Sequence, residues 1–165
     1  MTLNTLFGTN VTAPQRLQLK QIKAVYEVLN VSEDVTGYFT TGTRYTAPKQ
    51  VYDAFSFLME ETKEMFLCIH LDGKNRAICY DLVSIGSLNQ SIVHPREVFK
   101  TAFLSNAAAI ILIHQHPTGD PSPSTEDIAI TRRLKEAGEI MGIKILDHII
   151  VGDGEYLSFV ERGLL

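Results

Sequence analysis

Apolar side chains follow two patterns along this chain: a spacing of three to four residues in some segments and short continuous runs in others. The first pattern is typical of amphipathic helices, and the second of buried strands. Helical spacing predicts a helix over residues 14–29 and a second one from residue 51 into residue 60. Between them, residues 32–48 are rich in Gly and Thr and indicate a linker.

The run of residues 65–71 and the run of residues 76–83 are apolar and rich in β-forming residues. They flank Asp72-Gly73-Lys74-Asn75, a strong hairpin-turn sequence, and therefore predict two antiparallel strands. A short strand is expected over residues 86–92. Pro95, with Glu97 in the first turn, then begins a helix that ends near Asn106.

The C-terminal third alternates strands and helices. Residues 107–114 and 145–151 read as buried strands, and residues 156–159 as a last short strand. Residues 115–123 hold three prolines and form a loop, and residues 124–141 form a helix. Its apolar side chains are expected on or near one face: Ile128, Ile130, Leu134, Ala137 and Ile140. The pattern predicts an α+β fold: a mixed β-sheet with packed helices.

The length of 165 residues fits one main domain, expected over residues 46–165 after a short N-terminal helical extension and linker at residues 1–45. A net charge of −4 argues against a surface built to bind nucleic-acid phosphates. Arg132, Arg133 and Lys135 form either a local basic patch or the solvated face of a helix.

Features of an exported or membrane-bound chain are missing from the sequence. Its first charged residue is Arg16, so residues 1–15 lack the basic region of a secretory signal. The longest strictly apolar stretch, residues 107–113, is far shorter than the ~20 residues of a membrane helix. Cys68 and Cys79 lie in predicted strands; they would bond only if a hairpin aligned them, and reduced buried thiols are the commoner case. We therefore expect a cytoplasmic protein.

The candidate functional residues lie at the end of the strand of residues 107–114 and in the segment that follows it. His114 and His116 have the same parity, so strand geometry directs both imidazoles to one side. Asp127 follows a proline-stiffened loop and falls in the first turn of a helix, which can return a carboxylate toward the imidazoles. Two imidazoles and a carboxylate are a set of three protein ligands suited to zinc, with the fourth position left for water as in catalytic sites.

Two simpler explanations remain open at this point. Ser124 and Asp127 have the spacing of a helix cap, in which both side chains satisfy free backbone donors. His114 and His116, taken singly, can be ordinary hydrogen-bonded residues at a strand end. The combination of all these features favours a bound metal.

The spacing His114-x-His116-x7-Ser124-x2-Asp127 matches the JAMM, or MPN-plus, metalloprotease motif. Three stretches closely resemble the RadC-like branch of that family, and the resemblance covers roughly residues 48–165: His94-Pro95-Arg96-Glu97-Val98-Phe99, the loop from His116 to Ser124, and Asp147-His148-Ile149-Ile150-Val151-Gly152. The resemblance implies a cytidine-deaminase-like JAB/MPN fold, with His114, His116 and Asp127 as zinc ligands and Ser124 assisting the oxyanion.

The family also uses a glutamate just before the first core strand as general base, and by that placement the resemblance indicates Glu64. Glu60 and Glu61 lie nearby but belong to the preceding helix, where a solvated face is the default. Glu97 is a further candidate, which the helix dipole already explains. The chain departs from the family in small ways: Gln115 and Thr118 stand where RadC-like members often carry Asn and Ser. Longer members also have an N-terminal helix-hairpin-helix-like region, for which no clear glycine motif is found here.

The leading hypothesis is a zinc-dependent hydrolase of peptide or isopeptide bonds, with Zn²⁺ as cofactor and Glu64 as general base on a zinc-bound water. Its partner would be a peptide or protein substrate of unknown identity; tight nucleic-acid binding and membrane binding are not expected. The alternative is a DNA-repair or replication accessory acting through nucleic acid or a repair partner. A nucleobase deaminase is excluded because its His-x-Glu and Pro-Cys-x-x-Cys signature is missing. His148 and His70 are expected to be structural or surface residues.

Overall fold

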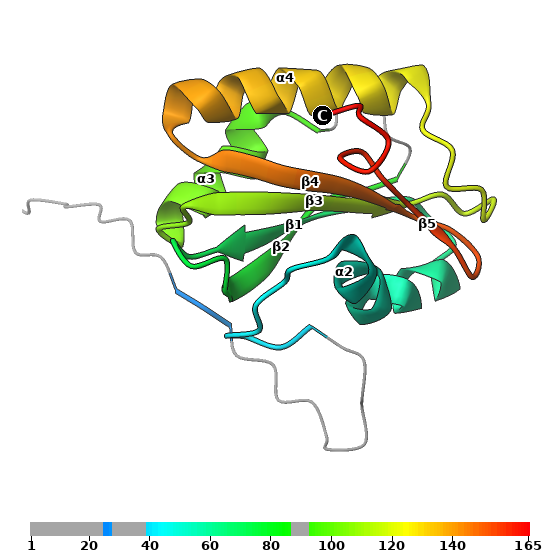
Figure 1. The fold of residues 1–165 in the computed structure, drawn as a ribbon, viewed down its shortest axis with the longest axis horizontal. Helices are drawn as coiled ribbons and strands as arrows, with labels where there is room; N and C mark the ends of the chain where they lie inside the picture. Colours follow the sequence, from blue (N-terminus) through cyan, green and yellow to red (C-terminus); the bar gives the residue numbers. More distant parts are fainter. Residues whose placement is uncertain (1–24, 28–38, 87–92) are drawn as a thin grey trace, which may run out of the picture.

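The computed structural model describes residues 25–27, 39–86 and 93–165 (Figure 1). In chain order the elements are α2 (Pro48–Phe55), the 3-10 helix η1 (Ser56–Glu60), β1 (Met65–Leu71), β2 (Ala77–Ile85), α3 (Pro95–Leu104), β3 (Ala109–Gln115), α4 (Thr125–Met141), β4 (Lys144–Val151) and β5 (Tyr156–Ser158). No helix among these residues is long and apolar enough to cross a bilayer.

The strands of the described residues form one five-stranded sheet in the order β2-β1-β3-β4-β5. Three neighbouring pairs are antiparallel, and β3 pairs with β4 in parallel. Parallel neighbours need a crossover connection, and α4 supplies it between these two strands. The prediction of an α+β fold with a mixed sheet is confirmed.

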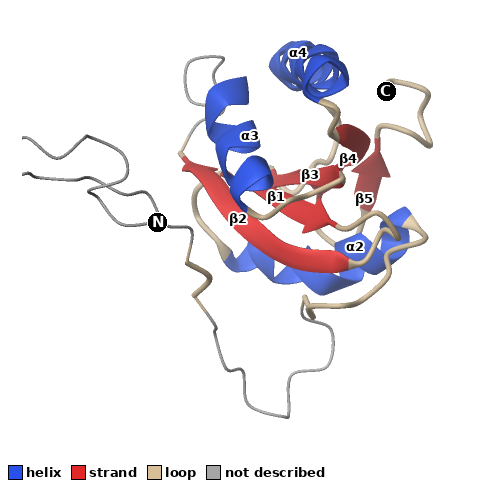
Figure 2. Ribbon diagram, turned by 90° about the vertical axis from the view of Figure 1, so that its left-hand side faces the viewer, coloured by secondary structure: helices blue, strands red, loops and turns tan. Residues whose placement is uncertain are grey.

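Helices cover both faces of the sheet: α3 and α4 lie on one face, and α2 lies on the other (Figures 1 and 2). The alternation of side chains along each strand supplies one apolar layer to each face. Phe66 and Leu112 pack with Phe99 of α3 and Leu134 of α4. Leu67, Ile69, Ile111 and Ile113 pack with Val51 and Phe55 of α2. The strand ends therefore lie between two helical layers.

The predicted β1–β2 hairpin is confirmed. The Asp72 carboxylate accepts hydrogen bonds from the backbone N–H groups of Lys74 and Arg76, at 2.8 and 2.9 Å, and so closes the turn. The two cysteines are not opposite each other, because Cys68 pairs with Asp81 and Cys79 with His70. Both are free thiols, and Cys68 is buried.

Some sequence-based predictions were wrong in detail. The helix expected to run into Glu60 changes to 3-10 geometry after Phe55. On α4, Ile130 and Leu134 are buried as expected, but Ile128 is 40% and Ile140 is 87% exposed. The buried residues of α4 recur every three to four positions, and Ile128 and Ile140 lie outside that face: Asp127, Ile130, Thr131, Leu134 and Gly138.

Two other predictions fall on residues outside the described part of the chain. The strand expected over residues 86–92 lies there except for Gly86, which is in a bend. Of the helix expected over residues 14–29, only Val25, Tyr26 and Glu27 are described, and these three are exposed and not helical. The described end of the linker, from Phe39, packs on the domain, where Phe39 contacts Tyr45 and Phe55.

Candidate metal centre

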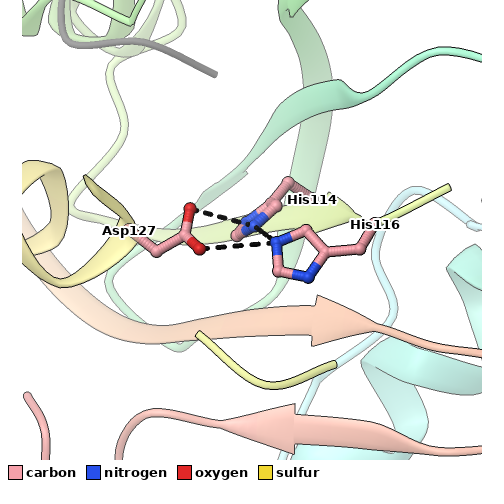
Figure 3. A group of neighbouring side chains, drawn as sticks. All are labelled: His114, His116 and Asp127. Carbon is pink, nitrogen blue, oxygen red and sulfur yellow. Dashed lines mark hydrogen bonds and ion pairs between the residues drawn. The ribbon is translucent and has the colours of Figure 1, made fainter. Parts of the chain in front are cut away.

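His114, His116 and Asp127 come together at the C-terminal end of β3 and the start of α4 (Figure 3). The Nε2 atoms of His114 and His116 lie 3.0 Å apart. Asp127 Oδ1 lies 3.2 Å from Nε2 of His114, and Oδ2 lies 3.4 Å from Nε2 of His116. The three side chains predicted from sequence are therefore adjacent in the structure.

These three groups could hold a metal ion. One ligand atom from each lies within 4.8 Å of the others. Zinc bonds to imidazole nitrogen and carboxylate oxygen of about 2.0–2.1 Å place neighbouring tetrahedral ligands about 3.3 Å apart, and the observed separations are 3.0, 3.2 and 3.4 Å. His114 and Asp127 are 0% and 1% exposed and His116 is 14% exposed, so solvent reaches the cluster from the side of His116. The donor set and its spacing fit zinc.

Asp127 serves as a helix cap and as a member of this cluster. Ser124 is the N-cap of α4, and its hydroxyl accepts from the Asp127 N–H at 3.1 Å. Asp127 Oδ2 in turn accepts from the Ser124 N–H at 2.7 Å and from its hydroxyl at 2.6 Å. Oδ1 has none of these capping partners and faces His114. The cap and the metal cluster, which the sequence offered as alternatives, are thus both compatible with the same carboxylate.

The loop after β3 orients His116. Nδ1 of His116 lies 2.8 Å from the carbonyl oxygen of Asp120, which accepts its proton and leaves Nε2 for the cluster. The loop also packs on the β4–β5 turn, where the Asp153 N–H donates to the Gly119 carbonyl at 2.9 Å. Gly152 permits this approach, because a Cβ there would lie 2.6 Å from that same carbonyl oxygen. The loop that sequence analysis predicted to be rigid is held by these contacts.

Of the two roles expected for His148, structural or surface, the structure shows the structural one, at a place beside His114 that the sequence did not predict. His148 lies inside β4, is 0% exposed, and its Nε2 is 2.8 Å from Nδ1 of His114. Its Nδ1 lies 2.6 Å from the hydroxyl of buried Thr131. His148 is therefore not a surface residue, and it is outside the ligand group. A sequence signal was available for its partner Thr131. This residue follows Asp127 by one helical turn, which puts both side chains on the same face of α4.

The protonation equilibria of the three groups depend on burial and on their mutual contacts. Burial lowers the pKa of His114, which favours the neutral imidazole that binds metals. The hydrogen bond with Asp127 raises the pKa of His116. Burial alone would raise the pKa of Asp127, but hydrogen bonds with His114, His116 and Ser124 outweigh it and hold that pKa well below its usual range. Without a metal, the carboxylate is ionised and attracts a proton to His116.

Glu64 is half-buried and immediately precedes β1. It lies near enough to the cluster for its negative charge to favour the protonated form of both His114 and His116, although burial still lowers the pKa of His114. Gln115, between the two histidines, fixes the chain around Glu64: its side chain accepts from the Met65 N–H and donates to the Lys63 carbonyl, at 2.9 and 2.5 Å.

The other candidate glutamates are differently placed. Glu60 and Glu61 are exposed. Glu97 accepts hydrogen bonds from Lys100 and Arg96, and these contacts, that with Lys100 first, lower its pKa. The carboxylate of Glu97 is thus already paired on the surface of α3.

The chain is similar to a known family over most of its length. A sequence model of the RadC-like JAB domain matches residues 45–164. A UPF0758 protein of Pelobacter propionicus is 68% identical over 123 residues, which are 74% of this chain and 54% of that protein. A UPF0758 protein of Trichlorobacter lovleyi is 64% identical over 123 residues, again 74% of this chain and 54% of that protein.

A third relative covers more of the chain. A UPF0758 protein of Methanosarcina acetivorans is 46% identical over 158 residues, which are 95% of this chain and 68% of that protein. The chain spans about half the length of the first two relatives, since each is covered to 54%.

Proposed function

Because the chain belongs to the RadC-like JAB domain family, we propose that it is a zinc-dependent hydrolase of peptide or isopeptide bonds. The observation that carries this proposal is the convergence of two histidine Nε2 atoms and one carboxylate within 4.8 Å. With three protein ligands, a tetrahedral zinc site keeps one position for a water molecule, as catalytic sites do. Family membership alone would not distinguish an enzyme from a binding protein, whereas three convergent metal-ligating side chains favour an enzyme.

His114, His116 and Asp127 would hold the zinc ion. When bound there, zinc would lower the pKa of a water molecule toward about 7 and polarise a substrate carbonyl. Burial of His114 and Asp127 supports this role, since ionic interactions are stronger where water is excluded.

Glu64 is proposed as the general base. Its half-buried position and its electrostatic effect on both histidines support a carboxylate close to the reacting water. It would accept the water proton on its carboxylate as the oxygen attacks the amide carbonyl, and then donate that proton to the leaving amine. The Gln115 hydrogen bonds on either side restrict the backbone of Glu64 and so limit the positions that its carboxylate can reach.

Ser124 is proposed to stabilise the oxyanion. Its hydroxyl donates to Asp127 Oδ2 in the absence of substrate, at 2.6 Å. For this role the hydroxyl rotates and donates instead to the negatively charged oxygen that develops from the substrate carbonyl. Its exposed position at the start of α4 leaves room for that change.

Metal analysis and a cleavage screen test the proposal together. Protein purified without chelator is expected to carry close to one zinc per chain, and Asp127→Ala to lose most of it. Glu64→Gln should keep the zinc but lower hydrolysis of any peptide or isopeptide found in the screen by about 10²–10⁴-fold, the usual contribution of a general base.

Glu97→Gln is the matched control, because Glu97 is paired with Lys100 and Arg96 on the surface. If Glu97→Gln abolished turnover and Glu64→Gln did not, the assignment of the base would be wrong. If the wild type neither carried nor took up zinc, the hydrolase proposal would fail.

A further inference from the structure

A chain of hydrogen bonds leads from the metal-binding cluster into the protein and returns to it. It begins at Nδ1 of His114, which lies 2.8 Å from Nε2 of His148. Nδ1 of His148 lies 2.6 Å from Oγ1 of Thr131. The Thr131 hydroxyl donates to the backbone carbonyl of Asp127 at 2.6 Å. The chain therefore connects two members of the cluster through two residues that are not members.

Three secondary-structure elements supply this chain. Leu112 pairs with His148 in the parallel β3–β4 register, so His148 faces α4 from the strand beside His114. Both intermediate residues are buried, with exposed fractions of 0% for His148 and 1% for Thr131. The His148 ring also packs between Phe66 and Phe159, with ring centroids 5.5 and 4.7 Å away. Its orientation is thus fixed by packing as well as by hydrogen bonds.

The positions of the protons follow from the last member of the chain. A carbonyl oxygen can only accept, so the single Thr131 hydroxyl proton is committed to Asp127. Thr131 can then only accept from His148, whose proton must be on Nδ1. A neutral His148 ring is left with an acceptor at Nε2, which takes the Nδ1 proton of His114. His114 consequently has its lone pair on Nε2, the atom that faces His116 and Asp127.

We propose that His148 and Thr131 are positioning residues that hold His114 in the tautomer and orientation required for metal binding. This inference rests on the proposed zinc site. Histidines that bind metals usually donate their second N–H to a carbonyl or carboxylate, as His116 does to Asp120. For His114 the acceptor of this proton is instead Nε2 of the neutral His148 ring. Because the chain ends on the Asp127 backbone, it also links β3 to the helix that carries the carboxylate ligand.

A pair of Thr131 variants separates this role from simple packing. Thr131→Val keeps the shape of the side chain but removes the hydroxyl, whereas Thr131→Ser keeps the hydroxyl and removes a methyl group. Zinc affinity, measured by competition with a chromophoric chelator, is expected to fall about 10–100-fold in Thr131→Val and to stay near the wild-type value in Thr131→Ser. Unchanged affinity in Thr131→Val, or an equal loss in both variants, would overturn the proposal.

Nitrogen NMR of the imidazole rings provides a test that needs no variant, in case Thr131→Val does not fold. In the metal-free wild-type chain at mildly alkaline pH, His148 is expected to carry its proton on Nδ1 and none on Nε2, and His114 to do the same. A proton on Nε2 of His148 would contradict the inference.

This readout also separates the two proposals. Zinc binding with the predicted tautomers but no hydrolysis would reject the hydrolase and keep the positioning role. Hydrolysis with the proton of His148 on Nε2 would keep the hydrolase proposal and reject the positioning role.

Discussion

The side-chain amide of Gln115 accepts a 2.9 Å hydrogen bond from the backbone N–H of Met65 and thereby joins the end of β3 to the start of β1. The same amide donates to the carbonyl of Lys63. The residue between those two backbone groups is Glu64. A residue placed between the two histidines of the motif thus fixes the backbone of the proposed general base.

Replacing Gln115 with Leu should therefore affect hydrolysis without removing the metal. The variant leaves the Met65 N–H and the Lys63 carbonyl without this partner, at a cost of about 1–3 kcal/mol in the free energy of unfolding. We expect zinc content to remain, and hydrolysis of a screened substrate to fall because Glu64 is less well held. Denaturant unfolding, metal analysis and cleavage rates measure the three effects.

Gln50→Leu is a suitable control for this experiment. The Gln50 side chain also accepts from backbone N–H groups, those of Thr46 and Ala47 at the start of α2. Its loss should lower stability without changing hydrolysis. If Gln115→Leu and Gln50→Leu had the same effect on cleavage, the proposed link between Gln115 and Glu64 would be rejected.

Gly152→Ala is expected to weaken the metal site from a distance. The new Cβ would lie 2.6 Å from the Gly119 carbonyl oxygen and 2.7 Å from Cδ of Pro121, so the loop must move. That loop carries the Asp120 carbonyl that orients His116. We expect a loss of about 1–3 kcal/mol in the free energy of unfolding, as for other overpacked sites, together with reduced zinc affinity in a chelator competition.

Gly154→Ala is the matched control, in the same β4–β5 turn. Its φ of +75° strains any side chain, but a Cβ there would meet nothing within 4 Å. It should lower stability and leave zinc affinity unchanged. Equal zinc affinities in Gly152→Ala and the wild type would mean that the loop position does not control His116.

The stability of the metal-free protein should depend on the protonation of His116. The hydrogen bond with Asp127 raises its pKa above the ordinary value of 6.5. A raised pKa in the folded state means that protonation stabilises the fold; this contribution is fully present below pH 6.5 and is lost as the pH rises through the raised value. Thermal unfolding of the wild type and of His116→Gln should therefore differ most at low pH and converge toward alkaline pH.

Zinc affinity is expected to increase over the pH range in which the stabilising contribution of His116 protonation is lost. The metal competes with the proton on His116, because only the neutral imidazole binds it. Zinc binding is expected to strengthen as the pH rises past 6.5 and to release protons, which titration calorimetry in buffers of different ionisation enthalpy measures. Affinity that did not vary between about pH 6 and pH 8 would argue against His116 as a ligand.

DNA binding by this chain is expected to be weak and strongly dependent on salt. The net charge is −4, and the exposed basic residues of α4 include Arg132, which pairs with Glu136 at 3.9 Å. Titration of duplex and single-stranded DNA at near-physiological salt measures the affinity. A dissociation constant below about 10⁻⁷ M would exceed the usual nonspecific range and favour the repair-accessory function.

The sequence alone was sufficient for features that depend on local spacing. The hairpin between β1 and β2 follows from its turn residues, and α4 begins at the predicted cap. The group of candidate metal ligands could also be predicted, because two residues of equal parity at a strand end and one carboxylate in the first turn of a helix each have a direction set by their own element. His114, His116 and Asp127 are accordingly adjacent in the structure.

Only the tertiary structure determined what surrounds these three residues. The sequence did not reveal that β4 would pair with β3 in parallel, and this pairing puts His148 beside His114. The Gln115 side chain likewise accepts from the N–H of Met65, the neighbour of Glu64, which is fifty positions away in the sequence. Such contacts depend on strand order and register, which long-range packing fixes and local periodicity does not encode. The chain's short-range pattern thus specifies the candidate metal-binding residues, whereas the packing of β1, β3, β4 and α4 specifies how each is oriented.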